Sequence, residues 1–470
     1  MRHLPRAVRP FLVPRFRLLA GALTLSLLGS GMWIVAVVWQ VIELDGGPVQ
    51  LSHVATAAAV GMLAAVLVGG VVADRVPQHR ILMAVELTKA VAVGAAAALA
   101  LTGGLAVWHL VVVSAVVGAT EGFFYPAYSA LLPTVLPPEQ LLAANGVEGV
   151  LRPAVMNAAG PAAASLVVAQ FSPGLAFALV SASQVLAATG LQLMGGAGRH
   201  RPQGEPGHPL RVLATELRGG FRYMTGTPWF MATLLFATVW VLLLMGPIEV
   251  LLPFAVRDQA GGGPEEFALV LASFGVGSAV GSLAVASWRM PRRYLTVMVL
   301  AWSVGATPVA LLGSTDRLWV MVAAVFVVGV TSGVGQVIWG TLLQRRVPRE
   351  LLGRVSSLDF FVSLLLMPVS MALAGPVGEA VGLRPVFLAA GLVPVVFGVA
   401  AIVLARMPKD EIEHPLTLEP EPHDGERGPD GSSGPQAGHR VEAESAGPDD
   451  AARTVPDDAG RTVPGGSGVR

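Results

Sequence analysis

Several charged side chains interrupt long apolar stretches of this sequence, and they are the residues best placed to do chemistry. Glu121 lies in the apolar stretch 105–127. If that stretch crosses a membrane, an unpaired charge there costs about 2.5–3.5 kcal/mol, so the residue should be paired or face water. Its carboxyl could carry a proton, or it could be a structural partner of Arg75 or Arg80. The sequence leaves both roles open.

Two further acids occupy related positions. Glu148 and Arg152 stand four residues apart, so on a helix they share one face and can pair. A shift of 211 residues (359 minus 148) places Asp359 at the position equivalent to Glu148. One interpretation is that these acids belong to a gate that is made and broken during a transport cycle. The other is that both are solvated residues just outside the apolar layer.

Three more charged residues lie in other apolar stretches. Glu86 and Lys89 are one helical turn apart and are expected to neutralise each other. Glu249 stands near the end of a later apolar stretch and is a candidate for binding a cation. The elements that must position all these charges are therefore long and apolar.

The composition indicates a lipid-facing surface. Hydrophobic residues make up 53% of the 470 residues and charged residues 13%, with a mean hydropathy of +0.65. The 55 glycines fit membrane helices, where small residues let backbones approach closely. With no cysteine, thiolate metal sites and cysteine nucleophiles are excluded.

Apolar stretches of about 20 residues, long enough to cross a bilayer, recur along most of the chain. The twelve predicted spans are 18–42, 52–73, 81–101, 105–127, 143–169, 174–194, 228–252, 266–288, 294–313, 318–341, 354–377 and 384–405. Arginine and lysine concentrate in alternate connections, while the others receive only Arg257, Arg317 and Arg384. By the positive-inside rule, both termini are then cytoplasmic.

The spans fall into two similar groups of six. Gly160-Pro161 recurs as Gly375-Pro376, and similar landmarks precede both pairs, as in transporters built from parallel repeats. We predict a cytoplasmic N-terminal segment (1–17), two six-helix halves (18–194 and 228–407), a cytoplasmic central loop (195–227) and a disordered cytoplasmic tail (408–470). The tail is rich in Pro, Gly, Asp, Glu and Ser and holds too little apolar surface to fold.

The turn after the second predicted span carries Gly70, Asp74 and Arg75, followed by Arg80. This pattern resembles the signature loop of the major facilitator superfamily, although Pro77 replaces its second glycine. The resemblance implies an all-α membrane protein with twelve transmembrane helices.

The predicted fifth span carries Gly160-Pro161, which resembles the motif of exporters in this superfamily. The sequence is most similar to the macrolide-efflux and enterobactin-exporter branch.

The resemblance also implies a central cavity lined by the first, fourth, seventh and tenth spans. The fourth carries Glu121. Other side chains on these spans that could contact a substrate are Gln40, Tyr125, Trp240, Gln336 and Trp339. Trp and Tyr near span ends could instead be interfacial anchors.

These features predict a multi-pass transporter of the inner (cytoplasmic) membrane that exports a lipophilic or amphipathic, drug-like molecule by proton antiport. A siderophore exporter and an uptake symporter of the same fold are alternatives, and a polytopic membrane enzyme is a third. The sequence has no phosphate-binding loop of the Walker type. We expect a monomer whose partners are a small-molecule substrate, protons and lipid, with no nucleic acid, cofactor, metal or catalytic residue.

Overall fold

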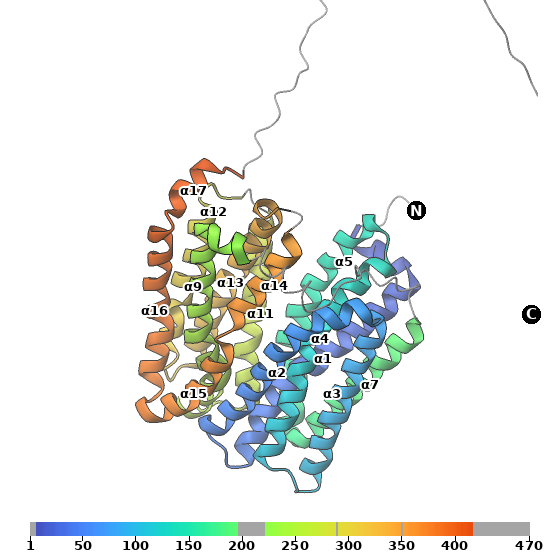
Figure 1. Cartoon of the computed structure of the whole chain (residues 1–470). Coiled ribbons are helices and arrows are strands. Elements are labelled where there is room, and N and C mark those ends of the chain that lie inside the picture. The colour runs from blue at the N-terminus through green and yellow to red at the C-terminus, as the bar shows by residue number, and fades with distance from the viewer. Residues whose placement is uncertain (1–5, 196–220, 288–289, 349–350, 417–470) are drawn as a thin grey trace, which may run out of the picture. The chain divides into compact units, whose positions relative to one another are not determined.

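The computed structural model describes residues 6–195, 221–287, 290–348 and 351–416, and the regular elements among them are all helices (Figure 1). In chain order they are η1 (Arg6–Leu12), α1 (Pro14–Glu43), α2 (Pro48–Arg75), α3 (Gln78–Leu101), α4 (Val107–Val135), α5 (Pro138–Leu151), η2 (Arg152–Ala159), α6 (Gly160–Gln170), α7 (Pro173–Met194), α9 (Pro228–Gly246), η3 (Pro247–Leu251), α10 (Leu252–Asp258), α11 (Pro264–Ser287), α12 (Tyr294–Ser303), η4 (Val304–Leu311), α13 (Leu318–Arg346), α14 (Leu352–Leu364), α15 (Met367–Val381), α16 (Leu383–Leu404) and α17 (Met407–Glu413).

Prolines mark many of the helix starts. α1, α2, α5, α7, α9 and α11 each begin at a proline, whose missing N–H costs nothing in the first turn and whose φ suits a helix. Within a bilayer, helices satisfy every backbone hydrogen bond internally. Large hydrophobic side chains remain exposed, as a lipid-facing surface allows, among them Trp108, Leu193, Trp319 and Val396.

Eleven helical runs among the described residues are long and apolar enough to cross a membrane. The predicted fifth span is not one of them. It coincides with the run α5, η2 and α6, which carries Glu148, Arg152 and Asn157. The count of twelve therefore stays a prediction, as does the orientation of the termini.

Two of the predicted segments differ from a simple helix or coil. The eleventh span is divided into α14 and α15 at Leu365 and Leu366, just before Pro368. The predicted tail begins with α17, whose Met407 and Glu411 are buried. The predicted central loop lies largely at 196–220, outside the described residues, and the rest of the tail, 417–470, does so too.

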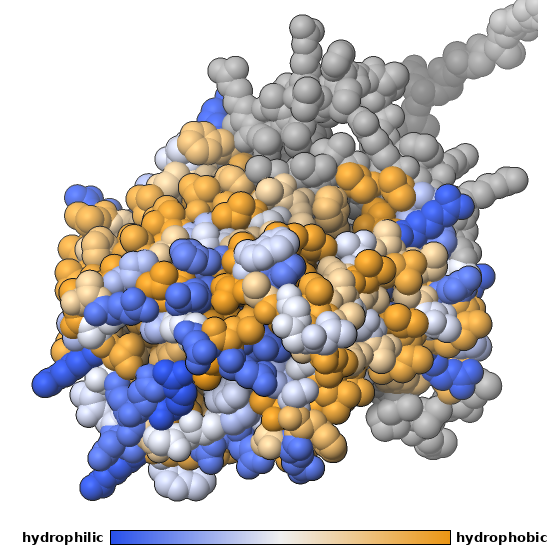
Figure 2. All heavy atoms as spheres, turned by 90° about the horizontal axis from the view of Figure 1, so that it is seen from below, coloured by the Kyte–Doolittle hydropathy of each residue, from blue (hydrophilic) through white to orange (hydrophobic). Residues whose placement is uncertain are grey.

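The helices have two ends that differ in composition. The arginine-rich end is where α2 meets α3, where α13 ends and where α17 lies; the arginine-poor end is where α1 meets α2 and α10 meets α11. Figure 2 views the arginine-poor end, where hydrophilic residues gather on part of the face and hydrophobic residues extend to its rim.

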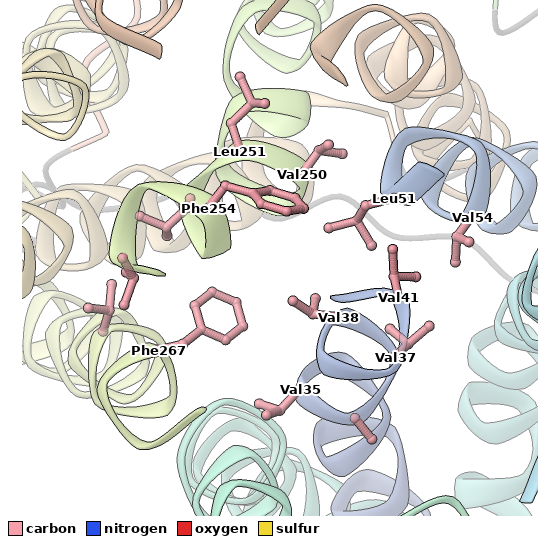
Figure 3. Close-up of a cluster of buried hydrophobic side chains, with 14 of the residues drawn as sticks. Val35, Val37, Val38, Val41, Leu51, Val54, Val250, Leu251, Phe254 and Phe267 are labelled. Atoms are coloured by element: carbon pink, nitrogen blue, oxygen red, sulfur yellow. The ribbon is translucent and has the colours of Figure 1, made fainter. Parts of the chain in front are cut away.

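The described helices form two groups, α1–α7 and α9–α16, and buried apolar residues from both groups form one shared core, to which α5, α12 and α14 do not contribute. Within this shared core, Val38 of α1 and Leu51 of α2 lie toward Phe254 and Phe267 (Figure 3). Toward the arginine-rich end there are instead two cores. An N-terminal core gathers residues of α1, α3, α4 and α7, and a C-terminal core gathers residues of α9, α12, α13 and α17. Apolar contact between the two groups of helices is thus concentrated in the shared core.

Polar contacts also join the two groups at the arginine-poor end. The N–H of Gly375 in α15 donates to the Ser52 hydroxyl of α2 over 2.7 Å. The N–H of Val49, in the first turn of α2, donates to the Glu379 carboxylate of α15 over 3.3 Å. At this end, α2 and α15 are therefore held together by hydrogen bonds as well as by apolar packing.

Glycines allow equivalent helix crossings in the two groups. A Cβ on Gly31 of α1 would collide with the carbonyl oxygen of Met156, and one on Gly246 of α9 would collide with that of Ser370. Gly31 and Gly246 are 215 residues apart (246 minus 31), the same shift that relates Gly160 to Gly375 (375 minus 160). The sequence repeat thus has a counterpart in the packing.

Candidate functional site

A cluster of charged and hydroxyl side chains is buried between α1, α3 and α4. We call Ser26, Ser30, Glu86, Lys89 and Glu121 the buried charge cluster. The Lys89 ammonium forms an ion pair with Glu121 at 2.5 Å, and the Ser30 hydroxyl donates to the same carboxylate over 3.2 Å. Lys89 is 2% exposed and Glu121 is 34% exposed, so the accessible part of the pair lies on the side of Glu121.

The pairing within this cluster differs from the sequence prediction. We expected Glu86 and Lys89 to neutralise each other, but Lys89 pairs with Glu121 across the α3–α4 interface. The long lysine side chain extends away from its own helix and passes over the ring of Phe124, whose centroid is 5.5 Å from Nζ. The described cationic partner of Glu121 is likewise Lys89, while Arg80 is exposed and the Arg75 side chain lies outside the described set, so a pair with Arg75 stays a prediction.

Glu86 is the most deeply buried member of the cluster. Its side chain is 0% exposed, and one carboxyl oxygen accepts a 2.7 Å hydrogen bond from Ser26. The other oxygen has no hydrogen-bond partner among the described residues. A cavity of about 10 Å³ lies beside this carboxyl and is also lined by Phe124 and Tyr128.

Glu148 and Arg152 do pair, with 3.0 Å between carboxylate and guanidinium. Arg152 begins the π-helical segment η2, which packs against α11, where Gly275 lies next to Asn157 and Pro153. The pair is therefore close to the interface between the two groups of helices.

Asp359 of α14 has different surroundings from its repeat partner Glu148. It is 8% exposed, and it accepts hydrogen bonds from the Trp339 indole at 3.0 Å and from the Ser363 hydroxyl at 3.4 Å. A solvated position is therefore wrong for Asp359. The two acids are equivalent in the repeat but not in their partners.

The predicted cavity residues divide into exposed and enclosed side chains. Gln336 and Glu249 are exposed, and Glu249 sits in the π-helical segment η3 next to residues of the shared core. Gln40 is buried and donates to Glu43 over 3.3 Å. The Trp240 indole donates to the Trp302 carbonyl over 3.1 Å.

The remaining predicted residues are two aromatic residues, the gate loop and the Gly160-Pro161 motif. Trp339 lies in the C-terminal core beside Trp229 and Phe230, so it is a packing residue that also holds Asp359. Tyr125 lies in α4 and Gly70, Asp74 and Arg75 lie at the end of α2, but their side chains fall outside the described set. Arg80 is exposed in the first turn of α3, and Gly160 and Pro161 are buried where α6 crosses α1.

Sequence reasoning missed the hydroxyl partners of the cluster. Ser26 and Ser30 are four residues apart on the first span, so they share the helix face that contacts Glu86 and Glu121. Two polar residues at that spacing in an apolar span were a signal that could have pointed to buried acids on neighbouring helices.

Comparison with known proteins places this arrangement in context. Residues 6–428 match the model of the family described as transmembrane secretion effector. The multidrug efflux pump Tap of Mycolicibacterium fortuitum is 31% identical over 416 residues, covering 84% of this chain and 96% of the relative. Tap of Mycobacterium tuberculosis is 30% identical over 426 residues, covering 86% and 97%.

More distant proteins match over a similar share of this chain. Macrolide efflux protein A of Streptococcus pyogenes is 23% identical over 395 residues, covering 83% of this chain and 95% of the relative. Among solved structures, that of the nucleoside transporter NupG matches with a TM-score of 0.64 at 10% sequence identity and covers 84% of this chain and 99% of its own. At this identity the likeness concerns the fold.

Proposed function

Because the chain belongs to the transmembrane secretion effector family of the major facilitator superfamily, we propose that it exports lipophilic or amphipathic, drug-like molecules across the cytoplasmic membrane. The relatives at 30–31% identity carry the name multidrug efflux pump, and a more distant one is named for macrolide efflux. The export is secondary transport, driven by protons that move inward as the substrate moves outward.

The observation that carries this proposal is the uneven contact between the two groups of helices. They share one apolar core around Val38, Leu51, Val250 and Phe254, but hold separate cores toward the arginine-rich end. A transporter that alternates access must close one end while the other can part. This distribution fits a conformation closed at the arginine-poor end, which the positive-inside rule places outside the cell.

Proton coupling is assigned to Glu121. Its carboxylate is partly exposed and paired with the buried Lys89. Taking up a proton would remove its negative charge and break that ion pair, so protonation is linked to a local rearrangement of α3 against α4. The ion pair of Glu148 and Arg152, at the interface with α11, and the buried Asp359 are assigned to gating.

The few charges on exposed cavity candidates favour lipophilic substrates. Gln336 offers hydrogen bonds, and Glu249, which forms no ion pair with another described residue, is suited to a cationic group. We propose that the protein works as a monomer with two six-helix halves, 18–194 and 228–407, connected by 195–227.

The test is transport into inverted vesicles energised by a proton gradient, with a panel of fluorescent dyes, antibiotics and siderophores. The wild type should accumulate members of the panel and lose this accumulation with an uncoupler. Glu121→Gln, which keeps the shape of the side chain but cannot ionise, should lose gradient-driven accumulation. Glu265→Gln, at an exposed acid in the first turn of α11, is the matched control.

Other outcomes would support the alternative functions. Accumulation of siderophores alone would indicate a siderophore exporter. Proton-driven movement of substrate out of the inverted vesicles, instead of into them, would indicate an uptake symporter. Transport that ignores the gradient in the wild type would contradict proton coupling. Full accumulation by Glu121→Gln would remove Glu121 from the coupling step.

A further inference from the structure

Glu86 is a buried acid that the proposed transport cycle does not yet use. It lies on α3 and contacts Ser26 of α1, while Phe124 and Tyr128 of α4 and Leu191 of α7 line the cavity beside it. α7 contributes no charged residue to these surroundings. The titratable groups that face Glu86 are Lys89 on its own helix, and Glu121 and Tyr128 on α4.

The charges of these neighbours do not leave a cation for Glu86. Two carboxyl groups compete for one ammonium, and the ammonium of Lys89 is engaged by Glu121. The nearby guanidinium of Arg152 pairs with Glu148. An ionised Glu86 would then be a carboxylate removed from water, with one oxygen unsatisfied and no ion-pair partner among the described residues. Proteins avoid such unpaired buried charges by neutralising the group.

We propose that Glu86 holds a proton while Lys89 is paired with Glu121, and that Lys89 transfers its ion pair to Glu86 when this proton moves to Glu121. The proposal rests on the proposed proton-coupled function and adds a second carboxyl to it. Glu86 is the dry storage position, and Glu121, which is 34% exposed, is the position that exchanges with water.

The exchange balances in charge and in protons. Before it, Glu86 is a neutral acid, Lys89 is a cation and Glu121 is a carboxylate. The O–H bond at Glu86 breaks, an O–H bond forms at Glu121, and the Lys89 ammonium, which keeps its three protons, moves to the new carboxylate. The three groups hold one carboxyl proton and zero net charge in both arrangements, so no step leaves a buried charge unpaired.

The spacing of Glu86 and Lys89 on α3 lets the Lys89 ammonium reach either acid with a small movement. Glu86 and Lys89 are three residues apart, so their side chains leave the same face of the helix one turn apart. Lys89 can change partner by rotating its flexible stem, without a shift of the backbone. The Ser26 hydroxyl, which already donates to Glu86, would stabilise the carboxylate form once Lys89 arrives.

Infrared difference spectroscopy on the purified full-length protein tests the proposal directly. The wild type should show the C=O stretching band of a protonated carboxyl, and Glu86→Gln should lose it. Glu121→Gln should lose the same band, because Lys89 then has only Glu86 as a partner and Glu86 ionises. The control Glu265→Gln should keep it.

Two spectroscopic results would overturn the proposal. If the band survives in Glu86→Gln, Glu86 is not the protonated group. If it survives in Glu121→Gln while disappearing in Glu86→Gln, Glu86 is neutral because of burial alone and Lys89 does not change partner.

Thermal unfolding gives a second readout for variants whose spectra are weak. Each single Gln variant leaves Lys89 one acid, whereas Glu86→Gln with Glu121→Gln leaves it none. The double variant should therefore lower the Tm by more than the sum of the two single changes, and adding Lys89→Met should restore much of the loss. Additive changes in Tm would contradict the exchange. Neither measurement depends on transport, so a protein that fails to pump could still show the exchange, and the two proposals can fail separately.

Discussion

Breaking the buried ion pair of Lys89 and Glu121 would leave an unpaired charge in a site removed from water. Removing one partner of a buried pair costs about 3–5 kcal/mol, because the other charge stays in a dry site. Lys89 is 2% exposed, so any step that protonates Glu121 must offer the ammonium another partner. Glu86, one helical turn away on α3, meets this requirement.

Another buried acid, Glu411, lies in α17 and outside the membrane-spanning helices. Its carboxylate accepts hydrogen bonds from the Thr296 N–H at 2.6 Å and from the Thr296 hydroxyl at 3.1 Å. Burial raises the pKa of the Glu411 carboxyl, although these hydrogen bonds and the nearby Arg293 act in the opposite direction. The docked helix therefore binds a proton more readily than the detached one.

This sign gives a pH dependence for the docking of α17. When the docked pKa lies above the value of about 4.3 for a free glutamate, docking gains stability from Glu411 at low pH and loses that gain as the pH rises through the raised pKa. Hydrogen-exchange protection of residues 407–413, corrected for the intrinsic rate, should fall over that interval. In Glu411→Gln this part of the pH dependence should disappear, and a wild-type profile in the variant would show that another group is responsible.

At the scale of elements, the two groups of helices repeat one crossing with different residues. Gly31 of α1 contacts the backbone at Met156, and Gly246 of α9 contacts the backbone at Ser370. The second crossing adds a hydrogen bond from the Gly246 N–H to the Ser370 hydroxyl at 2.8 Å. Close backbone approach of this kind replaces the hydrophobic effect that drives helices together in water.

Gly31→Ala and Gly246→Ala should each destabilise the protein, because the new methyl group has no room against a backbone carbonyl. Overpacking of this kind costs about 1–3 kcal/mol, which thermal unfolding in detergent can measure. Gly21→Ala, on the same helix as Gly31, meets nothing within 4 Å and should be neutral or stabilising by up to about 1 kcal/mol. Equal effects at Gly31 and Gly21 would show that helix propensity, not the crossing, sets the result.

The elements differ in how far the sequence could predict them. Apolar length predicted most of the helices, because lipid demands long apolar stretches whatever their neighbours are. The break at Leu365 and Leu366 and the π-helical segments η2 and η3 depend on packing between helices, which no local pattern encodes. The spacing of Glu148 and Arg152 was enough to predict their pair, since both lie on one helical run. The partner of Lys89 depended on how α3 meets α4, so spacing along α3 suggested Glu86 instead.

At the scale of the whole membrane region, the shared core near the arginine-poor end is the contact that must open if access alternates. The α2–α15 crossing belongs to it, with Ser52 bonded to Gly375 and Val49 to Glu379. Trp39 and Phe267 add an aromatic contact between α1 and α11, with ring centroids 5.6 Å apart. These contacts fit a conformation closed at this end, and the proposed alternating access requires them to separate in every cycle.

A covalent link across this crossing should therefore stop transport. The chain has no cysteine, so Val49→Cys and Glu379→Cys create a defined pair. The 3.3 Å hydrogen bond from the Val49 N–H to the Glu379 carboxylate shows that the two positions are neighbours, so a reducible thiol cross-linker with a flexible spacer can join them. Cross-linking should abolish drug accumulation in inverted vesicles, and a reductant should restore it. Each single variant treated with the same reagent should keep its activity, because one attached group cannot hold α2 to α15. Undiminished transport by the cross-linked protein would mean that this end never opens, and the release path would then have to run elsewhere.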